Sequence, residues 1–329
     1  MSRAPNFTVR PRSRGSSDDR AEHLLGAIAC LTFVGIVLMV VFVTARAAPT
    51  FAHNGLSWLG SGGNVDTQIG AMVSGAANVH VRVWPLIYGS LLTSALAVLL
   101  ALAISLLTAI FIVDLAPRRV RRLMLPVIRL LASVPSVIYG LIGILVLVPF
   151  VGNDLITTGQ KESVFNVIQL TGAGLLVSVV ILTVMVTPII TALTIEALAS
   201  VPRSWHEGAV ALGLNPVRAT ITVSLRAIRP AIVAATALAA ARALGEAIAV
   251  DMVSGGKAFS PNPADGLIFI YEPLRTAATT IIDQGDNLSI PSVRSTVYAL
   301  ALLLMFSGFL LSVASRLIRR SLRKYELSS

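Results

Sequence analysis

Six long apolar runs constrain this chain more than any other feature of its sequence. A helix needs about 20 predominantly apolar residues to cross roughly 30 Å of hydrocarbon. The runs cover residues 24–44, 86–113, 128–150, 170–195, 230–252 and 293–315. Because a lone segment in lipid must satisfy its own backbone hydrogen bonds, we expect each run to be a helix. The sequence therefore predicts an all-α integral membrane protein with six transmembrane helices.

The basic residues lie mostly on one side of this arrangement. Nineteen of the 26 lysines and arginines lie before the first run, in residues 114–129, between the fourth and fifth runs, or after the sixth. Segments that keep Lys and Arg face the cytoplasm, so we expect both termini there. Residues 1–22 have the composition of a disordered basic tail, and residues 319–329 form a second basic tail. Residues 23–82 then hold the first transmembrane helix and an outer loop.

A secretory signal peptide is the alternative interpretation of the first run. The letters "ARA" at 45–47 resemble a cleavage site. However, the apolar part is longer than a signal-peptide core, and five arginines precede it. We therefore favour a span that is not cleaved.

Composition excludes several classes of function. The basic charges lie between apolar runs rather than on a soluble face, which argues against nucleic-acid binding. The single cysteine, Cys30, allows no disulfide or cysteine-zinc site within the chain, and the four histidines are scattered without metal-ligand spacing. The chain has no phosphate-binding loop, since "SGGK" at 254–257 is followed by alanine. We therefore expect no bound cofactor or metal, and no nucleophile cluster suggests an intramembrane enzyme.

The segment between the fourth and fifth runs contains signals for two short helices. Ser204 and Glu207 have the spacing of a capping box. Gly213 can adopt the left-handed conformation that ends the first helix. Asn215 can cap a second helix with Pro216 at its first position. The sequence predicts a short helix, a turn and a second helix in the cytoplasm.

This short helix either lies on the membrane surface as a connector or docks onto a partner. Trp205, Ala209 and Leu212 fall at helical spacing and offer a small apolar face. Gly208 and Ala209 allow close approach by another chain. These features favour docking.

Four motifs resemble a known family of transporters. "EGAVALG" at 207–213 resembles the EAA loop of ABC importer permeases, with Gly208 in place of the middle alanine. The family pattern continues to Leu-Pro, where this chain has Arg226 instead of the proline. "SVPSVIYGL" at 133–141 and "ARALGEAIAV" at 241–250 resemble segments of phosphate importer permeases, and "PLIYGSLLTSALAVLLALAISLLTAIFI" resembles the opening of their transport domain. The tyrosine in "VPSVIYG" favours the PstC type.

The resemblance covers residues 83–318 and implies a type I ABC importer permease fold, with the EAA loop at 196–229. It implies a phosphate permease of the bacterial plasma membrane, paired with a PstA-type permease, two ATPase subunits that use ATP and Mg²⁺, and an external phosphate-binding protein. Sulfate or molybdate is the alternative cargo. A secondary transporter, which works without ATP, is a more distant alternative for the class of protein. The residues implied in coupling to the ATPase are Trp205, Glu207, Gly208, Ala209, Leu212 and Gly213.

Arg242 and Glu246 stand out inside the fifth run. A charge near the middle of a membrane costs about 2.5–3.5 kcal/mol on insertion scales. If the run is one helix, Glu246 lies one turn beyond Arg242 on the same face and can pair with it. The pair is then either a salt bridge that fixes packing or part of an anion path, in which the guanidinium meets phosphate. The resemblance supports the second interpretation.

Two prolines, Pro135 and Pro188, fall inside the predicted third and fourth spans. Proline removes a backbone hydrogen bond and bends a helix. The bends serve either packing or flexing between inward and outward forms, and the sequence does not separate the two.

Overall fold

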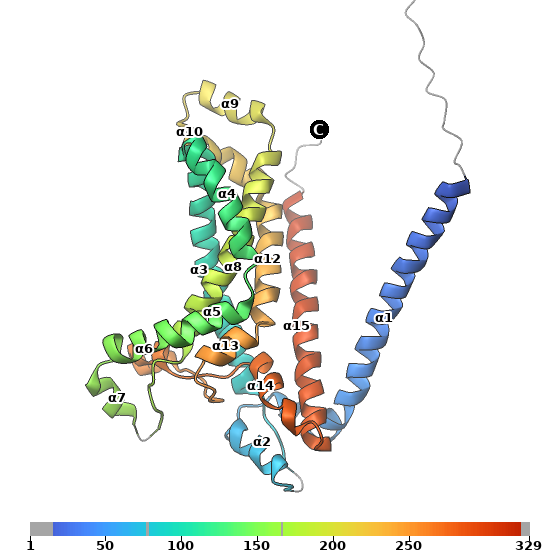
Figure 1. Ribbon diagram of the computed structural model, residues 1–329, viewed down its shortest axis with the longest axis vertical. Coiled ribbons are helices and arrows are strands. Elements are labelled where there is room, and N and C mark those ends of the chain that lie inside the picture. Colours follow the sequence, from blue (N-terminus) through green and yellow to red (C-terminus); the bar gives the residue numbers. More distant parts are fainter. Residues whose placement is uncertain (1–15, 77–78, 166, 324–329) are drawn as a thin grey trace, which may run out of the picture. The chain divides into compact units, whose positions relative to one another are not determined.

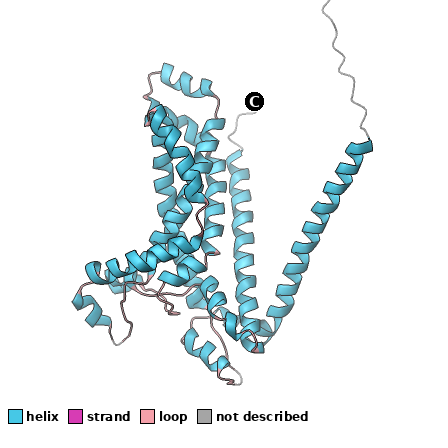
Figure 2. Cartoon of the chain, in the orientation of Figure 1, coloured by secondary structure: helices cyan, strands magenta, loops and turns pink. Residues whose placement is uncertain are grey.

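The computed structural model describes residues 16–76, 79–165 and 167–323, and the side chains of most of them. Every regular element in this part is a helix, apart from one isolated bridge between Gly255 and Leu274 (Figures 1 and 2). The predicted all-α class is confirmed. The predicted disorder of the N-terminal tail falls mainly on residues 1–15, outside the described part, and stays a prediction. Helix α1 (Ser16–Asn54) already begins within that tail.

Residues 1–45 form one structural unit and residues 46–329 another, and each is described by itself. In the first unit, the large apolar side chains of α1 from Leu24 to Phe42 are exposed. A helix that is apolar on all faces and unburied by its own chain suits a lipid environment. The helix continues beyond the predicted end at residue 44, through Pro49, to Asn54.

Four long helices form the centre of the second unit: α3 (Trp84–Ile110), α8 (Leu175–Ser200), α12 (Arg229–Leu244) and α15 (Pro291–Arg323). Figure 1 shows α3, α8 and α12 side by side, with α15 against α12. Small residues line the buried faces of α3 and α12, at Ala97, Ala101, Ala235, Ala239 and Ala243. Small side chains let helix backbones approach closely in membranes. Thr183 and Ser105 add hydrogen bonds between α3 and α8, at 3.3 and 3.0 Å.

The predicted third span, 128–150, has the wrong boundaries. Helix α4 (Arg118–Ala132) ends before Pro135, and the apolar span runs over Ser136–Leu155 instead. It comprises α5 (Ser136–Ile142), α6 (Val148–Phe150) and two π-helical turns, η3 (Gly143–Leu147) and η4 (Val151–Leu155). A residue before proline avoids the helical conformation, so Pro135 separates two helices rather than bending one. Pro188 does lie inside α8, as predicted.

The predicted fifth span, 230–252, is also broken. Helix α12 stops at Leu244, and α13 (Ile248–Val253) follows as a separate short helix. In the part of the chain that the structure describes, five helices are long and apolar enough to cross a membrane. A sixth span results if Pro216–Ala227 and Arg229–Leu244 count as one, bent by 73°. The multi-pass architecture is therefore confirmed, although the predicted third and fifth spans are each interrupted by a break between helices.

The segments that are predicted to face the outside, here called the outer segments, are folded rather than irregular. They contain η1 (Gly55–Leu59), α2 (Val65–Val73), α7 (Thr158–Val164), η6 (Pro263–Tyr271), α14 (Ala277–Asp283) and η7 (Gly285–Asn287). Trp58, Val65 and Ile69 pack with Ala277 and with the start of α15 in a small cluster, here called the outer core. Residues 60–64, which include "GSGG", remain an irregular connection between η1 and α2.

Candidate functional site

Helix α9 (Arg203–Ala211) projects from one end of the second unit (Figure 1). It begins two residues earlier than predicted, with Pro202 at its N-cap position and no side-chain cap. Ser204 therefore lies within the first turn and cannot cap it. The predicted capping box between Ser204 and Glu207 is wrong, because Pro202 and its fixed φ start the helix instead.

The end of α9 follows the prediction. Gly213 has φ +90°, and its N–H donates to the Val210 carbonyl at 2.9 Å. The Leu214 N–H donates to the Ala209 carbonyl at 3.2 Å, which completes a Schellman motif. Asn215 then caps α10 (Pro216–Ala219) by accepting a 3.0 Å hydrogen bond from the Val217 N–H. These hydrogen bonds fix a tight turn over residues 212–215, between α9 and α10.

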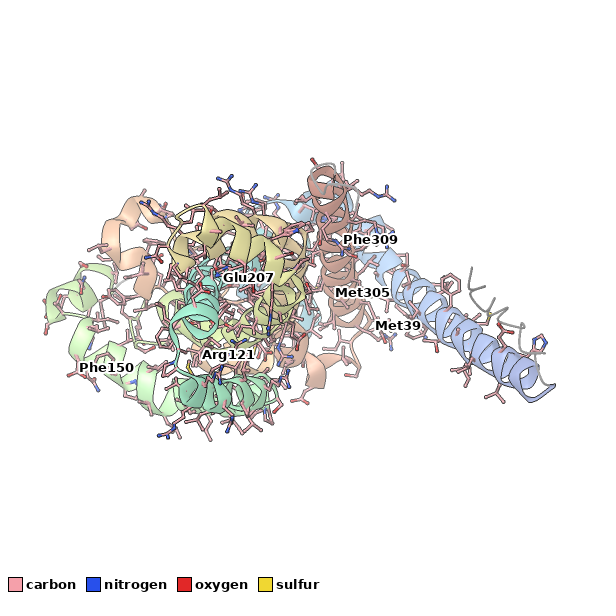
Figure 3. All side chains as sticks on the ribbon, turned by 90° about the horizontal axis from the view of Figure 1, so that it is seen from above. Met39, Arg121, Phe150, Glu207, Met305 and Phe309 are labelled. Atoms are coloured by element: carbon pink, nitrogen blue, oxygen red, sulfur yellow. The ribbon has the colours of Figure 1, made fainter. Side chains whose placement is uncertain are left out.

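The apolar face of α9 divides between the chain itself and its surroundings. Ala209 is buried by the chain itself. It therefore cannot make the contact with a partner that the sequence predicted for it. Trp205 and Leu212 are 48% and 88% exposed. Glu207 and Gly208 are exposed as well, and Figure 3, which looks down on this end, labels the Glu207 side chain. A side chain added at Gly208 would meet no atom of this chain within 4 Å, so the chain does not itself explain this glycine.

A continuous path leads from α9 to α12. After α10 come a π-helical turn, η5 (Thr220–Ser224), and α11 (Leu225–Ala227). The chain then bends by 73° at Ile228 and enters α12. The Thr220 hydroxyl donates to Asp114 Oδ1 at 3.0 Å and ties the path to the end of the α3 span. A displacement of α9 would therefore reach α12 through one short bent connection.

Arg242 lies in the last turn of α12, at the end away from α9. It is exposed in the isolated chain. Within the described residues it forms no ion pair. An unpaired guanidinium on lipid is costly, so this side chain must face protein or water in the assembled molecule.

Glu246 does not pair with Arg242. The helix ends at Leu244, so the expected one-turn spacing is absent. Glu246 instead accepts a 3.1 Å hydrogen bond from the Ala249 N–H and caps the start of α13. The predicted neutralisation of Arg242 by Glu246 is wrong because "LGEA" forms a break between helices rather than a turn of one helix.

Helix α13 packs closely on α5. A Cβ atom at Gly140 would lie 3.0 Å from the Ala249 Cα atom and 2.8 Å from the Met252 sulfur. Tyr139, the neighbouring residue, donates its hydroxyl to the Leu131 carbonyl at 2.9 Å, across the break at Pro135. The two motifs "VPSVIYG" and "ALGEAIAV" are thus brought together in space. Their contact at Gly140 was not anticipated from the sequence.

The outer core contains an ion-pair cluster that the sequence did not indicate. Arg275 Nη1 lies 2.7 Å from Asp66 Oδ1, and Arg275 Nε lies 3.1 Å from Asp283 Oδ2. Asp66 also accepts a 2.9 Å hydrogen bond from the Ala258 N–H. The cluster joins α2 to α14 across more than 200 residues of sequence, so it holds the outer segments together.

Glu272 is a buried carboxyl group on the same side. Its side chain accepts a 3.1 Å hydrogen bond from the Asn262 N–H. Burial raises its pKa, the Asn262 N–H lowers it, and the Asp265 charge raises it. The net shift is upward, because one hydrogen bond does not replace the lost hydration.

Comparison with known proteins gives a consistent result. The model of the binding-protein-dependent transport system inner membrane component family matches residues 115–324. The chain is 37% identical over 247 residues, 72% of each chain, to the phosphate transport system permease protein PstC 1 of Mycobacterium tuberculosis. It is 30% identical to the "Probable ABC transporter permease protein YqgH" of Bacillus subtilis, over 94% of this chain and 93% of that one. Among solved structures, a chain of a bacterial alginate ABC transporter shares the fold at TM-score 0.59 and 14% identity, over 95% and 99% of the two chains.

Proposed function

The chain belongs to the family of binding-protein-dependent transport system inner membrane components, and on that premise we propose that it carries inorganic phosphate into the bacterial cytoplasm. It is a multi-pass membrane protein with the fold of type I ABC importer permeases. The relatives named as phosphate permeases support phosphate as the cargo. The arginine in the last turn of α12 suits a tetrahedral oxyanion, because its planar fork matches two oxygens at once.

The exposed helix α9 is the observation that carries the proposal. Trp205 and Glu207 on α9, and Leu212 directly after it, are uncovered at the end of the unit. Tryptophan is enriched among the residues that contribute most to binding at protein interfaces. We assign this surface to an ATPase subunit. That subunit would bind and hydrolyse ATP, because the sequence of this chain has no phosphate-binding loop. The full complex would comprise this chain, a PstA-type permease, two ATPase subunits using ATP and Mg²⁺, and an external phosphate-binding protein.

The path from α9 to Arg242 gives a mechanism for coupling. Closure of the ATPase subunits would move α9, and the bend at Ile228 would pass that movement to α12. Arg242, at the far end of α12, would then change its exposure to the anion. Glu246 would keep α13 against α5 during this movement rather than neutralise the arginine. In this mechanism the position of α12, and not an ion pair between Arg242 and Glu246, controls the access of the anion to Arg242.

Uptake by the reconstituted complex tests the cargo and the energy source together. Vesicles loaded with ATP should accumulate radiolabelled phosphate, and vesicles without ATP should not. Excess sulfate or molybdate should compete weakly. Strong competition would assign the permease to another oxyanion, and accumulation without ATP would indicate a secondary transporter.

The proposed orientation has both termini in the cytoplasm, from the placement of Lys and Arg. Fusions of a reporter that is active only outside the membrane should be silent at both ends. An active reporter at the C-terminus would overturn this topology and would place α9 on the wrong side for an ATPase.

A further inference from the structure

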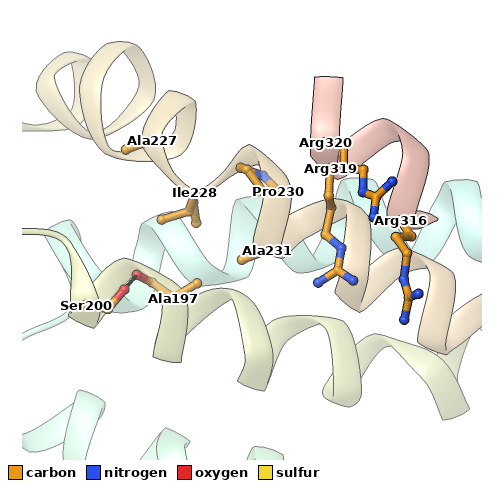
Figure 4. Close-up of a pocket in the computed structure, with 9 residues that line it drawn as sticks. All are labelled: Ala197, Ser200, Ala227, Ile228, Pro230, Ala231, Arg316, Arg319 and Arg320. Carbon is orange, nitrogen blue, oxygen red and sulfur yellow. Dashed lines mark hydrogen bonds between the residues drawn. The ribbon is translucent and has the colours of Figure 1, made fainter. Parts of the chain in front are cut away.

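A cleft of about 560 Å³ opens where α8 ends, α12 begins and α15 approaches its last turns. Three arginines of α15, Arg316, Arg319 and Arg320, line one side of it. Ser200, Ile228 and Pro230 line the other. Figure 4 shows the arginine side chains reaching from α15 into the space between the helices. The cleft is separate from α9 and from Arg242.

The described part of the chain does not neutralise the charges in this cleft. The residues that line it include no carboxylate among those the structure describes, and none of the three arginines forms an ion pair there. The end of α8 and the start of α12 contribute partial charges of opposite sign, each about half an elementary charge, which offset one another. Three full positive charges therefore remain, and they favour an anion.

The surroundings indicate what kind of anion fits. Clefts of roughly 300–1,000 Å³ hold molecules larger than a single ion. Leu317 and Ile318, next to these arginines on α15, are 58% and 49% exposed and offer a surface for acyl chains. Guanidinium groups bind phosphate oxygens in pairs, and basic pockets between membrane helices on the cytoplasmic side suit lipid headgroups.

We infer that this cleft binds the phosphate of an anionic phospholipid headgroup. The site contacts both ends of the segment that joins α8 to α12, since Ser200 is the last residue of α8 and Ile228 lies at the bend before α12. A bound headgroup would tie α15 to these two points and hold the bend between α11 and α12. The lipid would then support the connection through which α9 acts on α12.

Lipid retention tests this inference on the full chain, purified with the subunits that stay bound to it. The protein is placed in nanodiscs of phosphatidylcholine with or without phosphatidylglycerol, and retained lipid is counted by native mass spectrometry. The triple variant R316Q/R319Q/R320Q should bind phosphatidylglycerol roughly 100-fold more weakly, at about fivefold for each arginine near an anionic headgroup. The triple variant R118Q/R119Q/R122Q removes the same charge from exposed positions on α4 and should retain the lipid.

Further arms separate the source of the phosphate and guard against misfolding. Inorganic phosphate, added in excess to the phosphatidylcholine nanodiscs, should change the thermal midpoint of the native chain and of the cleft variant by the same amount. If it raises the midpoint of the native chain and the cleft variant abolishes that rise, the lipid assignment is overturned in favour of the free ion. The variant R316K/R319K/R320K keeps the positive charges and should retain most of the lipid. It serves as the charge control if the Gln variant folds poorly. Equal phosphatidylglycerol retention by the cleft and α4 variants would refute the site. The readout does not depend on which anion the permease transports.

Discussion

The EAA loop and the outer core both connect membrane helices, yet the chain stabilises them in opposite ways. The loop is stabilised by local hydrogen bonds at the turn between α9 and α10, and it leaves large side chains exposed. The outer core is stabilised by contacts between distant segments, with Trp58 buried and Arg275 paired twice. The difference separates a surface that needs a partner from a region that needs none. Substitutions in the loop and at Arg242 should therefore reduce transport, and substitutions in the outer core should reduce stability.

The largest effect on transport is expected from Arg242→Gln. The change keeps size and polarity but removes the charge that meets the anion, so uptake per assembled complex should fall about 100-fold, the scale of losing a charge-assisted contact of roughly 3 kcal/mol. Arg242→Lys should recover only part of it. Uptake of phosphate is measured beside the yield of assembled complex.

Glu246→Gln is the matched control for Arg242. An amide oxygen can still accept the hydrogen bond from the Ala249 N–H, so uptake should stay near normal. An equal loss of uptake in both variants would support an ion pair between Arg242 and Glu246, which the structure does not contain. Loss of assembled complex with normal uptake in the remainder would make Arg242 a packing residue.

A smaller but clear effect is expected from Gly208→Trp. The chain leaves open space at this position, so folding should be unchanged, while a bulky side chain should block close approach of the ATPase. ATP-driven uptake should fall roughly tenfold or more, as expected when an interface loses about 1.4 kcal/mol or more. Gly159→Trp on α7 is the control, because that glycine also has open space around it. Normal coupling in the Gly208 variant would remove α9 from the interface.

Arg275→Met should destabilise the protein without changing uptake per folded complex. The change leaves Asp66 and Asp283 unpaired, with side chains 29% and 24% exposed. Breaking a fully buried pair costs about 3–5 kcal/mol, and partial exposure lowers this to roughly 2 kcal/mol. The thermal midpoint in detergent should fall accordingly, and Arg294→Met should leave it nearly unchanged. A normal midpoint with poor uptake would give the outer core a direct role in transport.

The smallest effect concerns the pH dependence of stability at Glu272. Its raised pKa means that the folded protein keeps a proton that the unfolded chain releases above the ordinary value of 4.5. This contribution is fully present below pH 4.5 and is lost as pH rises through the raised pKa. Glu272→Gln should remove the pH dependence of the thermal midpoint between these two pKa values. It should also raise the thermal midpoint at neutral pH. An unchanged pH profile would show that burial does not perturb this carboxyl.

The sequence predicted the parts of the fold that depend on neighbouring residues. The apolar runs identified the helical membrane class, and Gly213 and Asn215 located the turn of the loop because both act through adjacent backbone groups. The same reasoning failed at Ser204, because Pro202 starts the helix first. It also failed at 128–150 and 230–252, where hydropathy alone does not distinguish one span from two helices with a break. The only available signals were Pro135 and Gly245.

The candidate site could be predicted as residues but not as geometry. Arg242 was conspicuous because a charge in an apolar run is costly. Its relation to Glu246 depended on an assumed continuous helix, which the break after Leu244 removes. The contact of Gly140 with Ala249, and the pairing of Arg275 with Asp66, join segments more than 100 residues apart. Such contacts leave no periodic pattern in a single sequence.

Site-specific labelling tests the account most directly, because it asks which side each region faces and what covers it. In a chain with Cys30 replaced by serine, single cysteines are placed at Ala211 on α9 and at Gly159 on α7, both exposed positions. The account predicts that Cys at 159 reacts with a membrane-impermeant thiol reagent added outside intact cells. Cys at 211 should be unreactive there and should cross-link to an ATPase subunit in inverted membranes. Reaction of position 211 from outside, or failure to cross-link in a complex that transports phosphate, would contradict the proposed coupling through α9.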